Sequence, residues 1–384
     1  RNNPSSPRHI ENIGYYWAMS DYTDLGMWAD WRSGAGGTNE FDPGWWQLTA
    51  ESKYRWNSRF LGGRFAFSYM KENSGNTNHR LSWDHQQQFG RNRRFTANAN
   101  YTSSTTLQRR NTFDVAQAMG TIRSNLNYQD KIGPASLQVG ATQTQFPGRS
   151  QIERTLPEIS VNSSPLSVGK AFTWTPSFKF TERASLKIDQ ALPIPTRLIT
   201  DATGAVIRID SLRPDRRERT IVVGTPVSLF GYQLDNSFTI RDEVKDYPEE
   251  LLLYPDADSS RKELRVYSRT YQTAIDWNPT FTLPVPGFLQ SRFKLAPSVS
   301  LQNVDGGKPY WIRNQFTGGK YVSQSKRLTY GLTTTPTIFG LLPGFGPFLR
   351  FRHTLSPTIS YQYAPAKTVG NEFLEAVSQS RQIY

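Results

Sequence analysis

The sequence predicts an all-β fold, a transmembrane antiparallel β-barrel with roughly 14 to 16 strands in this chain as part of a larger barrel. Three observations lead to this prediction. Apolar and polar residues alternate along many segments, aromatic residues make up 13% of the chain, and the mean hydropathy is only −0.59. A strand that crosses a bilayer has about 9–11 residues, with one face toward lipid and the other toward water. We expect residues 1–384 to form one barrel domain.

The alternation is clearest between Gln47 and Trp56. Apolar or small side chains occupy every second position, and amide, hydroxyl or charged side chains fall between them, at Gln47, Thr49, Glu51, Lys53 and Arg55. This two-residue period is typical of a strand with two different faces. It recurs over residues 61–69, 80–84, 94–101, 122–128, 136–141, 172–180, 230–240 and 358–363.

Polar breaks separate these segments. Asn73–Asn78 and Gly90–Arg94 have the composition of turns, and short turns can join antiparallel neighbours. We expect longer loops, at the wider extracellular end, at Gly34–Pro43, Thr200–Arg217 and Asp242–Lys262. Asn371–Gln382 is also expected to form a loop.

The tripeptide Pro-Gly-Phe occurs twice, at residues 286–288 and 343–345. Each copy precedes a similar segment that contains a proline, residues 292–300 and 350–360. This repetition suggests one type of strand used twice. Since proline cannot donate to a β-ladder, we expect bulges or bends at these prolines.

Aromatic residues favour a membrane barrel over a soluble β-sandwich or solenoid, because the apolar faces are rich in Tyr, Trp and Phe rather than in Val, Ile and Leu. The chain has 10 Trp, 18 Tyr and 22 Phe. Aromatic side chains at strand ends form girdles at the two membrane interfaces. The candidate girdle residues are Trp45, Trp56, Tyr69, Trp83, Tyr101, Tyr128 and Tyr361.

No motif in the chain predicts covalent chemistry. Metal-ligand spacing is absent around the four histidines, for which a structural or lumen-facing role is expected, and the chain has no cysteine. A Gly-x-Ser-x-Gly elbow is also absent, and the acidic residues around Asp256 do not have EF-hand spacing. The sequence therefore predicts a protein that is not an enzyme and holds neither a metal nor a cofactor.

The formal net charge of +13 indicates an anionic partner. The Lys and Arg clusters are short, so nucleic acid is not expected as that partner. Five cations fall on the polar faces of successive strands, which would line the barrel lumen. They can guide anionic cargo, or they can pair with residues such as Glu51 and Asp84 to fill water-lined space. The five candidates are Lys53, Arg55, Arg64, Arg94 and Arg123.

Four segments resemble, in the same order along the chain, parts of the barrel of LptD-type LPS-assembly proteins, of the Bacteroidetes-like, non-proteobacterial kind. They are Gly14–Leu25 (GYYWAMSDYTDL), residues 81–101 (LSWDHQ and FTANANY), Leu156–Ser160 (LPEIS) and Arg352–Tyr361 (RHTLSPTISY). Each segment alone is a weak signal, but their ordered occurrence over nearly the whole chain is more specific.

The resemblance implies an outer-membrane protein of a Gram-negative-type bacterium that transports lipopolysaccharide without covalent chemistry. Periplasmic bridge proteins deliver the lipid through a β-jelly-roll domain, a plug lipoprotein of the LptE kind fills the lumen, and the cargo leaves sideways into the outer leaflet. The exit is a seam between the first and last barrel strands. The candidate residues of the first strand are Ile13, Tyr15, Trp17 and Met19.

The chain also departs from this family. It lacks the jelly-roll domain and the cysteines of some members, and about 15 strands are too few for so large a barrel. We therefore expect a fragment without its closing strands. Two other functions stay open: a porin or substrate-specific channel, and a soluble or surface-anchored all-β glycan-binding protein.

Overall fold

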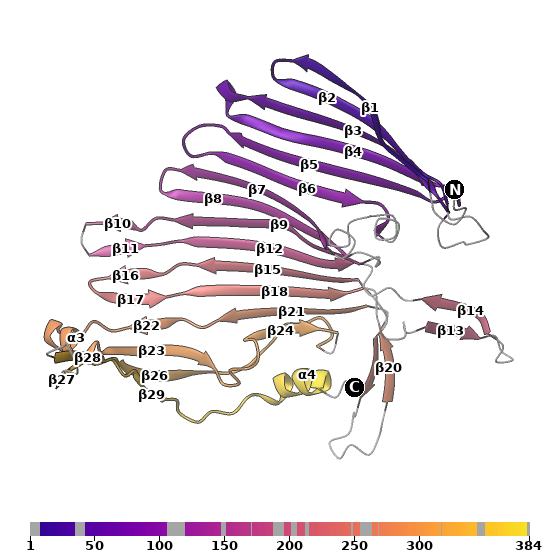
Figure 1. Ribbon diagram of the computed structural model, residues 1–384. Helices are drawn as coiled ribbons and strands as arrows, with labels where there is room; N and C mark the ends of the chain where they lie inside the picture. Colours follow the sequence, from indigo (N-terminus) through magenta and orange to yellow (C-terminus); the bar gives the residue numbers. More distant parts are fainter. Residues whose placement is uncertain are drawn as a thin grey trace. The chain divides into compact units, whose positions relative to one another are not determined.

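Figure 1 shows a computed structural model of the chain. It describes residues 8–34, 43–105, 120–146, 151–169, 171–186, 196–200, 206–211, 215–246, 249–253, 263–267, 269–315, 317–343 and 350–381. These residues form an all-β fold with large antiparallel sheets, which confirms the predicted fold class. No helix in the described ranges is both long and apolar enough to span a membrane.

The chain divides into two compact units, and the first comprises residues 1–160, 181–217 and 245–247. Its strands follow one another in sequence order, each antiparallel to the one before, from β1 to β8. Short turns join alternate pairs, such as the two residues between β7 and β8. The strands are β1 (His9–Ser20), β2 (Thr23–Arg32), β3 (Trp45–Trp56), β4 (Leu61–Glu72), β5 (Thr77–Gln88), β6 (Arg94–Thr102), β7 (Ile122–Ile132) and β8 (Ala135–Gln145), followed in the sheet by β9 (Ile152–Ser163) and β12 (Ser177–Leu186).

The registers of this sheet separate two chemically different faces, because directly opposed residues point to the same side. One face is apolar and open to the surroundings: Tyr15 is 68% exposed and Leu48 is 52% exposed. The other face carries charged, amide and hydroxyl side chains. An apolar face left uncovered to this extent is unfavourable in water and suits a lipid environment.

The second unit comprises residues 161–180, 218–244 and 248–384. One run of neighbouring strands consists of β15 (Arg216–Gly224), β18 (Ser237–Lys245), β21 (Thr270–Trp277), β24 (Trp311–Asn314) and β25 (Val322–Ser323). An eight-stranded sheet contains β10 (Leu166–Val168), β11 (Phe172–Trp174), β16 (Val227–Leu229), β17 (Tyr232–Asp235), β22 (Thr280–Thr282), β23 (Ala296–Asn303), β26 (Lys326–Thr334) and β29 (Ile359–Tyr363).

Smaller elements complete the described fold. In the first unit, Asn57–Arg59 form a 3-10 turn, η1, and β13 (Thr196–Thr200) pairs with β14 (Val206–Ser211). The second unit contains two further hairpins and two helices. They are β19 (Glu249–Leu253) with β20 (Glu263–Tyr267), β27 (Ile338–Pro343) with β28 (Arg350–Leu355), α3 (Gly287–Phe293) and α4 (Asn371–Arg381).

A row of prolines interrupts the strands of the second unit. Pro226 separates β15 from β16, Pro279 separates β21 from β22, and the same role falls to Asn236 between β17 and β18. The short strands β16, β17 and β22 continue β15, β18 and β21 end to end (Figure 1). Proline has no N–H to give to the ladder, so the interruptions at Pro226 and Pro279 occur where regular pairing is impossible.

Backbone hydrogen bonds still cross this row. The Thr175 amide donates to the Pro226 carbonyl at 3.2 Å, and the Thr225 amide donates to the Asn236 carbonyl at 2.8 Å. Lys326 fixes the end of the row by donating to the Trp277 carbonyl and, at 2.9 Å, to Asn303 Oδ1. Neighbouring strands therefore stay hydrogen-bonded across these interruptions.

The strand and turn boundaries agree with some of the sequence predictions and differ from others. Breaks occur within both predicted turns, Asn73–Asn78 and Gly90–Arg94, but Thr77 and Asn78 already belong to β5 and Arg94 to β6. Fifteen of the described strands have eight or more residues, and this number lies within the predicted 14 to 16 strands. Residues 172–180 and 230–240 were each expected to form one strand, which is wrong because Pro176 and Asn236 divide them.

Three loop predictions were wrong. Thr200–Arg217 contains β14, and Asp242–Lys262 contains the end of β18 and all of β19. Asn371–Gln382 contains the helix α4. Most of Gly34–Pro43 lies outside the described residues, as does Asp256.

The repeated Pro-Gly-Phe motif does not introduce the same structure twice. The first copy leads into the helix α3, whereas most of the second copy lies outside the described residues. Pro297 sits within β23 in unbroken register, so no bulge forms there. Pro357 follows the end of β28 and precedes β29, which agrees with the expected interruption.

The helix α4 forms the one cluster of buried apolar side chains among the described residues. Phe373, Ala376 and Val377 lie on one face of the helix, spaced by three and four positions, and pack with Ile312 and Val322. Phe373 is only 2% exposed. The helix is therefore held by packing onto β24 and β25.

Replacing Phe373 with alanine should release α4. Removing a fully buried phenylalanine costs about 3–5 kcal/mol, which exceeds what a helix of three turns can supply by itself. Hydrogen exchange of the peptide covering α4 should accelerate strongly in Phe373→Ala and stay unchanged in the neighbouring control Leu374→Ala, whose side chain is 48% exposed. Equal protection in both variants would contradict the packing role of Phe373.

Candidate functional site

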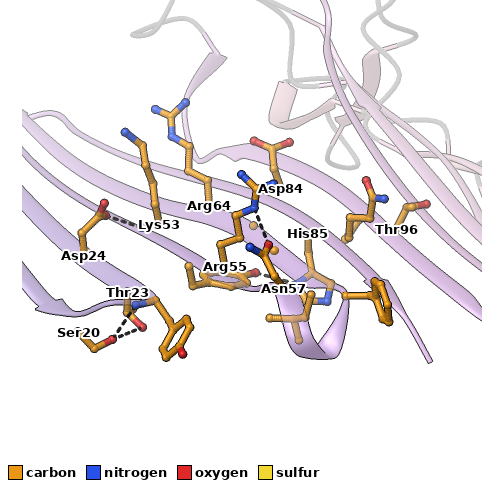
Figure 2. A pocket seen from close by; sticks show the side chains of 18 of the residues that line it. Ser20, Thr23, Asp24, Lys53, Arg55, Asn57, Arg64, Asp84, His85 and Thr96 are labelled. Atoms are coloured by element: carbon orange, nitrogen blue, oxygen red, sulfur yellow. Dashed lines mark hydrogen bonds between the residues drawn. The ribbon is translucent and has the colours of Figure 1, made fainter. Parts of the chain in front are cut away.

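A row of charged residues crosses the polar face of the first unit. The registers place Asp24 opposite Lys53, Lys53 opposite Arg64, and Arg64 opposite Asp84. Figure 2 shows these four side chains projecting from the same side of the sheet. An aspartate therefore stands at each end of the row, and the two cations, Lys53 and Arg64, are neighbours in its centre.

Glu51 resolves this contact between the two cations. Its carboxylate accepts a hydrogen bond from Arg64 Nη2 at 2.7 Å and forms an ion pair with Lys53 Nζ at 3.2 Å. The Glu51 side chain is almost buried, whereas the two cationic side chains are 62% (Lys53) and 53% (Arg64) exposed. One carboxylate thus neutralises part of the charge and leaves both cations accessible from the polar side.

A cavity of about 1060 Å³ adjoins this row, and its lining includes Lys53, Arg55 and Arg64. Arg55 Nε donates to Asn57 Oδ1 at 3.0 Å. Arg94 and Arg123 belong to the same polar face on β6 and β7, in other rows, and are not among the residues that line the cavity. The structure therefore brings together three of the five cations predicted to line the lumen.

Asp24 connects the charged row to the strand at the edge of the sheet. Its carboxylate accepts from the Lys53 backbone amide at 3.0 Å and from Tyr16 Oη at 3.3 Å. Tyr16 lies on β1, so this aspartate contacts both neighbours of β2. Sequence reasoning missed Tyr16 and Asp24, because only the register shows that they share a face.

The strand β1 is the first in the sheet order and pairs only with β2 among the described strands. All of its residues are exposed, including the four candidate seam residues Ile13, Tyr15, Trp17 and Met19. Ile13, Tyr15 and Trp17 lie on the apolar face, opposite Ala29, Met27 and Leu25.

The pairing of β1 with β2 is irregular at two places. One shift falls between Ile10 and Ile13, where Asn12 has a φ of 58° and its amide donates to Asp30 Oδ1 at 2.8 Å. The second falls between Ala18 and Ser20, at Met19. Bulges of this kind weaken a ladder locally and occur often at sheet edges.

Aromatic side chains gather at both ends of the apolar face. Near the short turns, Tyr54 Oη accepts from Trp83 Nε1 at 2.9 Å and contacts His85 Nδ1 at 2.8 Å. Near the other end, Tyr69 packs against Trp46 and His79. Tyr54 lies opposite Gly63 of β4, and Tyr69 follows six residues later on the same strand. The two aromatic groups are therefore ~20 Å apart along the strand direction. That spacing is close to the height of the apolar band of membrane barrels, about 25 Å.

The structure places most candidate girdle residues on the apolar face. Trp56, Trp83 and Tyr128 belong to the end near the short turns, and Tyr69 and Tyr101 lie toward the other end, as the registers show. Tyr361 is exposed on β29 of the second unit. The prediction for Trp45 was wrong: it faces the polar side, opposite Glu72, and is only 6% exposed.

The site offers binding groups rather than reacting groups. In the described ranges, no group of three or more His, Asp or Glu side chains could hold a metal ion. His79 and His85 are parts of the aromatic clusters, in the structural role expected for them. What the arrangement supplies is a water-facing surface with accessible cations and an edge strand beside it.

Glu51→Gln should destabilise the first unit modestly, because an uncharged amide cannot neutralise Lys53 and Arg64 together. The expected loss is about 1 kcal/mol, since both cations are partly solvated. The midpoint of thermal unfolding in detergent, read by heat-modified electrophoretic mobility, should fall. Lys53→Gln is the matched control and should cause a smaller loss, because Glu51 keeps its shorter contact with Arg64. An unchanged midpoint in Glu51→Gln would rule out a stabilising role for this carboxylate.

The sequence was compared with models of known protein families and with curated proteins. Residues 6–170 match the family model of the LptD protein. A search of curated proteins finds no match. The matched stretch covers β1 to β10 and therefore contains the edge strand, the charged row and the cavity beside it. LptD proteins act in lipopolysaccharide transport and assembly at the outer membrane and are not enzymes. This match, together with the all-β fold, shows that residues 6–170 are similar to the LptD family.

Proposed function

We propose that this chain forms the wall of an outer-membrane barrel and passes lipopolysaccharide into the outer leaflet through an opening at β1. The observation that carries the proposal is the state of β1, an edge strand with exposed apolar residues and two irregularities in its only described pairing. A closed barrel has no free edges, so an exit for lipid requires one strand pair that separates easily.

The two faces of the sheet suit an amphipathic cargo. An acyl chain can follow the apolar face past Tyr15 and Trp17 into the bilayer, while sugars and phosphates stay on the polar face. The net charge of +13 and the accessible cations Lys53 and Arg64 fit the anionic groups of such a lipid. Transport of this kind needs two adjoining environments and no bond-making group.

The partners follow from the family. We infer that periplasmic bridge proteins deliver the lipid to this chain, and that a plug lipoprotein of the LptE kind occupies the lumen. In this proposal the first unit supplies one side of the seam and the strand on the other side belongs to the rest of the barrel. The Bacteroidetes-like subtype stays a prediction.

Two alternatives differ in measurable ways. A porin or channel predicts ion conductance through an open lumen. A soluble glycan-binding protein predicts extraction without detergent, which the exposed apolar face of β1 to β5 argues against.

A photo-crosslinking amino acid at Tyr15 should capture lipopolysaccharide in cells, because Tyr15 lies on the apolar face of the proposed exit strand. The same amino acid at Leu48 is the matched control: Leu48 lies on the same face and is also exposed, but on the interior strand β3. Adducts are detected with an antibody against the lipid. Surface labelling of lipopolysaccharide after depletion of the protein tests transport itself.

Equal capture at Tyr15 and Leu48 would falsify the exit at β1. Normal surface labelling after depletion, together with channel conductance of the purified protein, would favour the porin instead.

A further inference from the structure

Trp28 is a large aromatic residue on the polar face of the first unit. The registers place it at one end of a cross-strand row in which Thr49, Ser68 and Arg80 follow on β3, β4 and β5. The next row consists of Gly26, Glu51, Ala66 and Ser82. Because this second row is mostly small, a hollow is left beside Trp28.

Two glycines make room for the tryptophan. A Cβ placed on Gly14 would lie 2.6 Å from Trp28 Cβ, and a Cβ placed on Gly26 would lie 3.3 Å from Trp28 Cζ3 on the indole ring. The indole therefore lies back over Gly26 and borders the hollow. Any larger residue at Gly14 would displace it.

The hollow has a volume of about 350 Å³, large enough for one or two sugar rings. Trp28 forms one side, and the rest of its lining includes Glu51, Arg64, Ser68, Arg80 and Ser82. It lies wholly within the first unit, and its lining begins on β2, the strand next to the edge strand β1.

The charges around the hollow favour an anion. Glu51 is already engaged by Lys53 and Arg64. Arg80, by contrast, forms no salt bridge with any carboxylate in the described part of the chain. An incoming carboxylate or phosphate can therefore bind the Arg80 guanidinium, which no acid of the described residues engages, in the two-point geometry that arginine offers to such groups.

We propose that this hollow binds an anionic sugar unit, whose C–H face stacks on Trp28 and whose carboxylate or phosphate pairs with Arg80. A pyranose ring has an apolar face and a rim of hydroxyl groups, so it matches an aromatic platform surrounded by Thr49, Ser68 and Ser82. The proposal rests on the proposed function, because the saccharide of the transported lipid is the sugar that passes along this face.

The test uses the full chain purified in detergent and binding measured by calorimetry. The probe is the lipid-free oligosaccharide released from lipopolysaccharide by mild acid, and neutral maltohexaose is the comparison sugar. Trp28→Ala should weaken binding of the acidic oligosaccharide by about tenfold, and Trp28→Phe should retain most of it. Arg80→Gln should also lose about tenfold, with partial rescue by Arg80→Lys.

Trp31→Ala is the matched control. Trp31 lies on the same strand β2, three residues from Trp28, but faces the apolar side opposite Trp46. Its loss should leave the affinity unchanged. Phosphatase treatment of the probe separates the two sources of charge: lost binding assigns Arg80 to a phosphate, and retained binding assigns it to a carboxylate.

Three outcomes overturn the proposal: unchanged affinity in Trp28→Ala, equal affinity for maltohexaose, or no binding to the folded wild-type chain. None of them bears on the exit at β1, because capture at Tyr15 and surface labelling measure transport without reference to this hollow. A failure of the sugar site is thus distinguishable from a failure of the proposed function.

Discussion

The backbone ladder between successive strands is the interaction on which the rest of this structure depends. Every strand from β2 to β5 is paired along both sides, so the backbone amides and carbonyls in these ladders are satisfied without water. Once the hydrogen bonds of the backbone are made in this way, one whole face of the sheet can carry apolar side chains and the other can carry charged ones. Few described apolar residues are buried, because the apolar face packs against surroundings rather than against a second layer of protein.

The polar face shows how charge is kept in such a sheet. Glu51 holds two cations at once, and Asp84 accepts from Asn98 Nδ2 at 2.5 Å. These contacts support the pairing hypothesis for Lys53 and Arg64, yet both side chains stay more than half exposed. Pairing and guidance of anionic cargo are therefore compatible on this face, since a partly neutralised cation can still attract an anion.

Much of the fold could be predicted from the sequence because the two-residue period is a local property. The strands around Lys53, Arg64 and Trp83, their faces and the turns between them all follow from it. Trp45 was assigned to the wrong face because aromatic character, rather than its place in the alternation, suggested the girdle. The helix α4 was missed because only Phe373, Ala376 and Val377 show a helical spacing, in a segment otherwise polar.

The candidate site was less accessible to sequence reasoning. Which cations meet, and that Tyr16 reaches Asp24, depend on register, which joins residues far apart in the chain. Trp28 gave no signal by itself, because a tryptophan on a strand suggests lipid contact until its row is known. The sequence shows the prolines at residues 226 and 279. It does not show that they interrupt neighbouring strands at similar positions.

The order of strands in the first unit also determines how it can assemble. Among the described residues, each strand from β1 to β8 pairs with its neighbours in sequence, so the ladders of this run do not require a distant part of the chain. The entropy lost in closing each hairpin is small, and such local topologies fold quickly. Strands can be added one after another to the growing edge, beginning with β1 and β2. The outer edge of β1 would then be the first backbone formed and the last to find a partner.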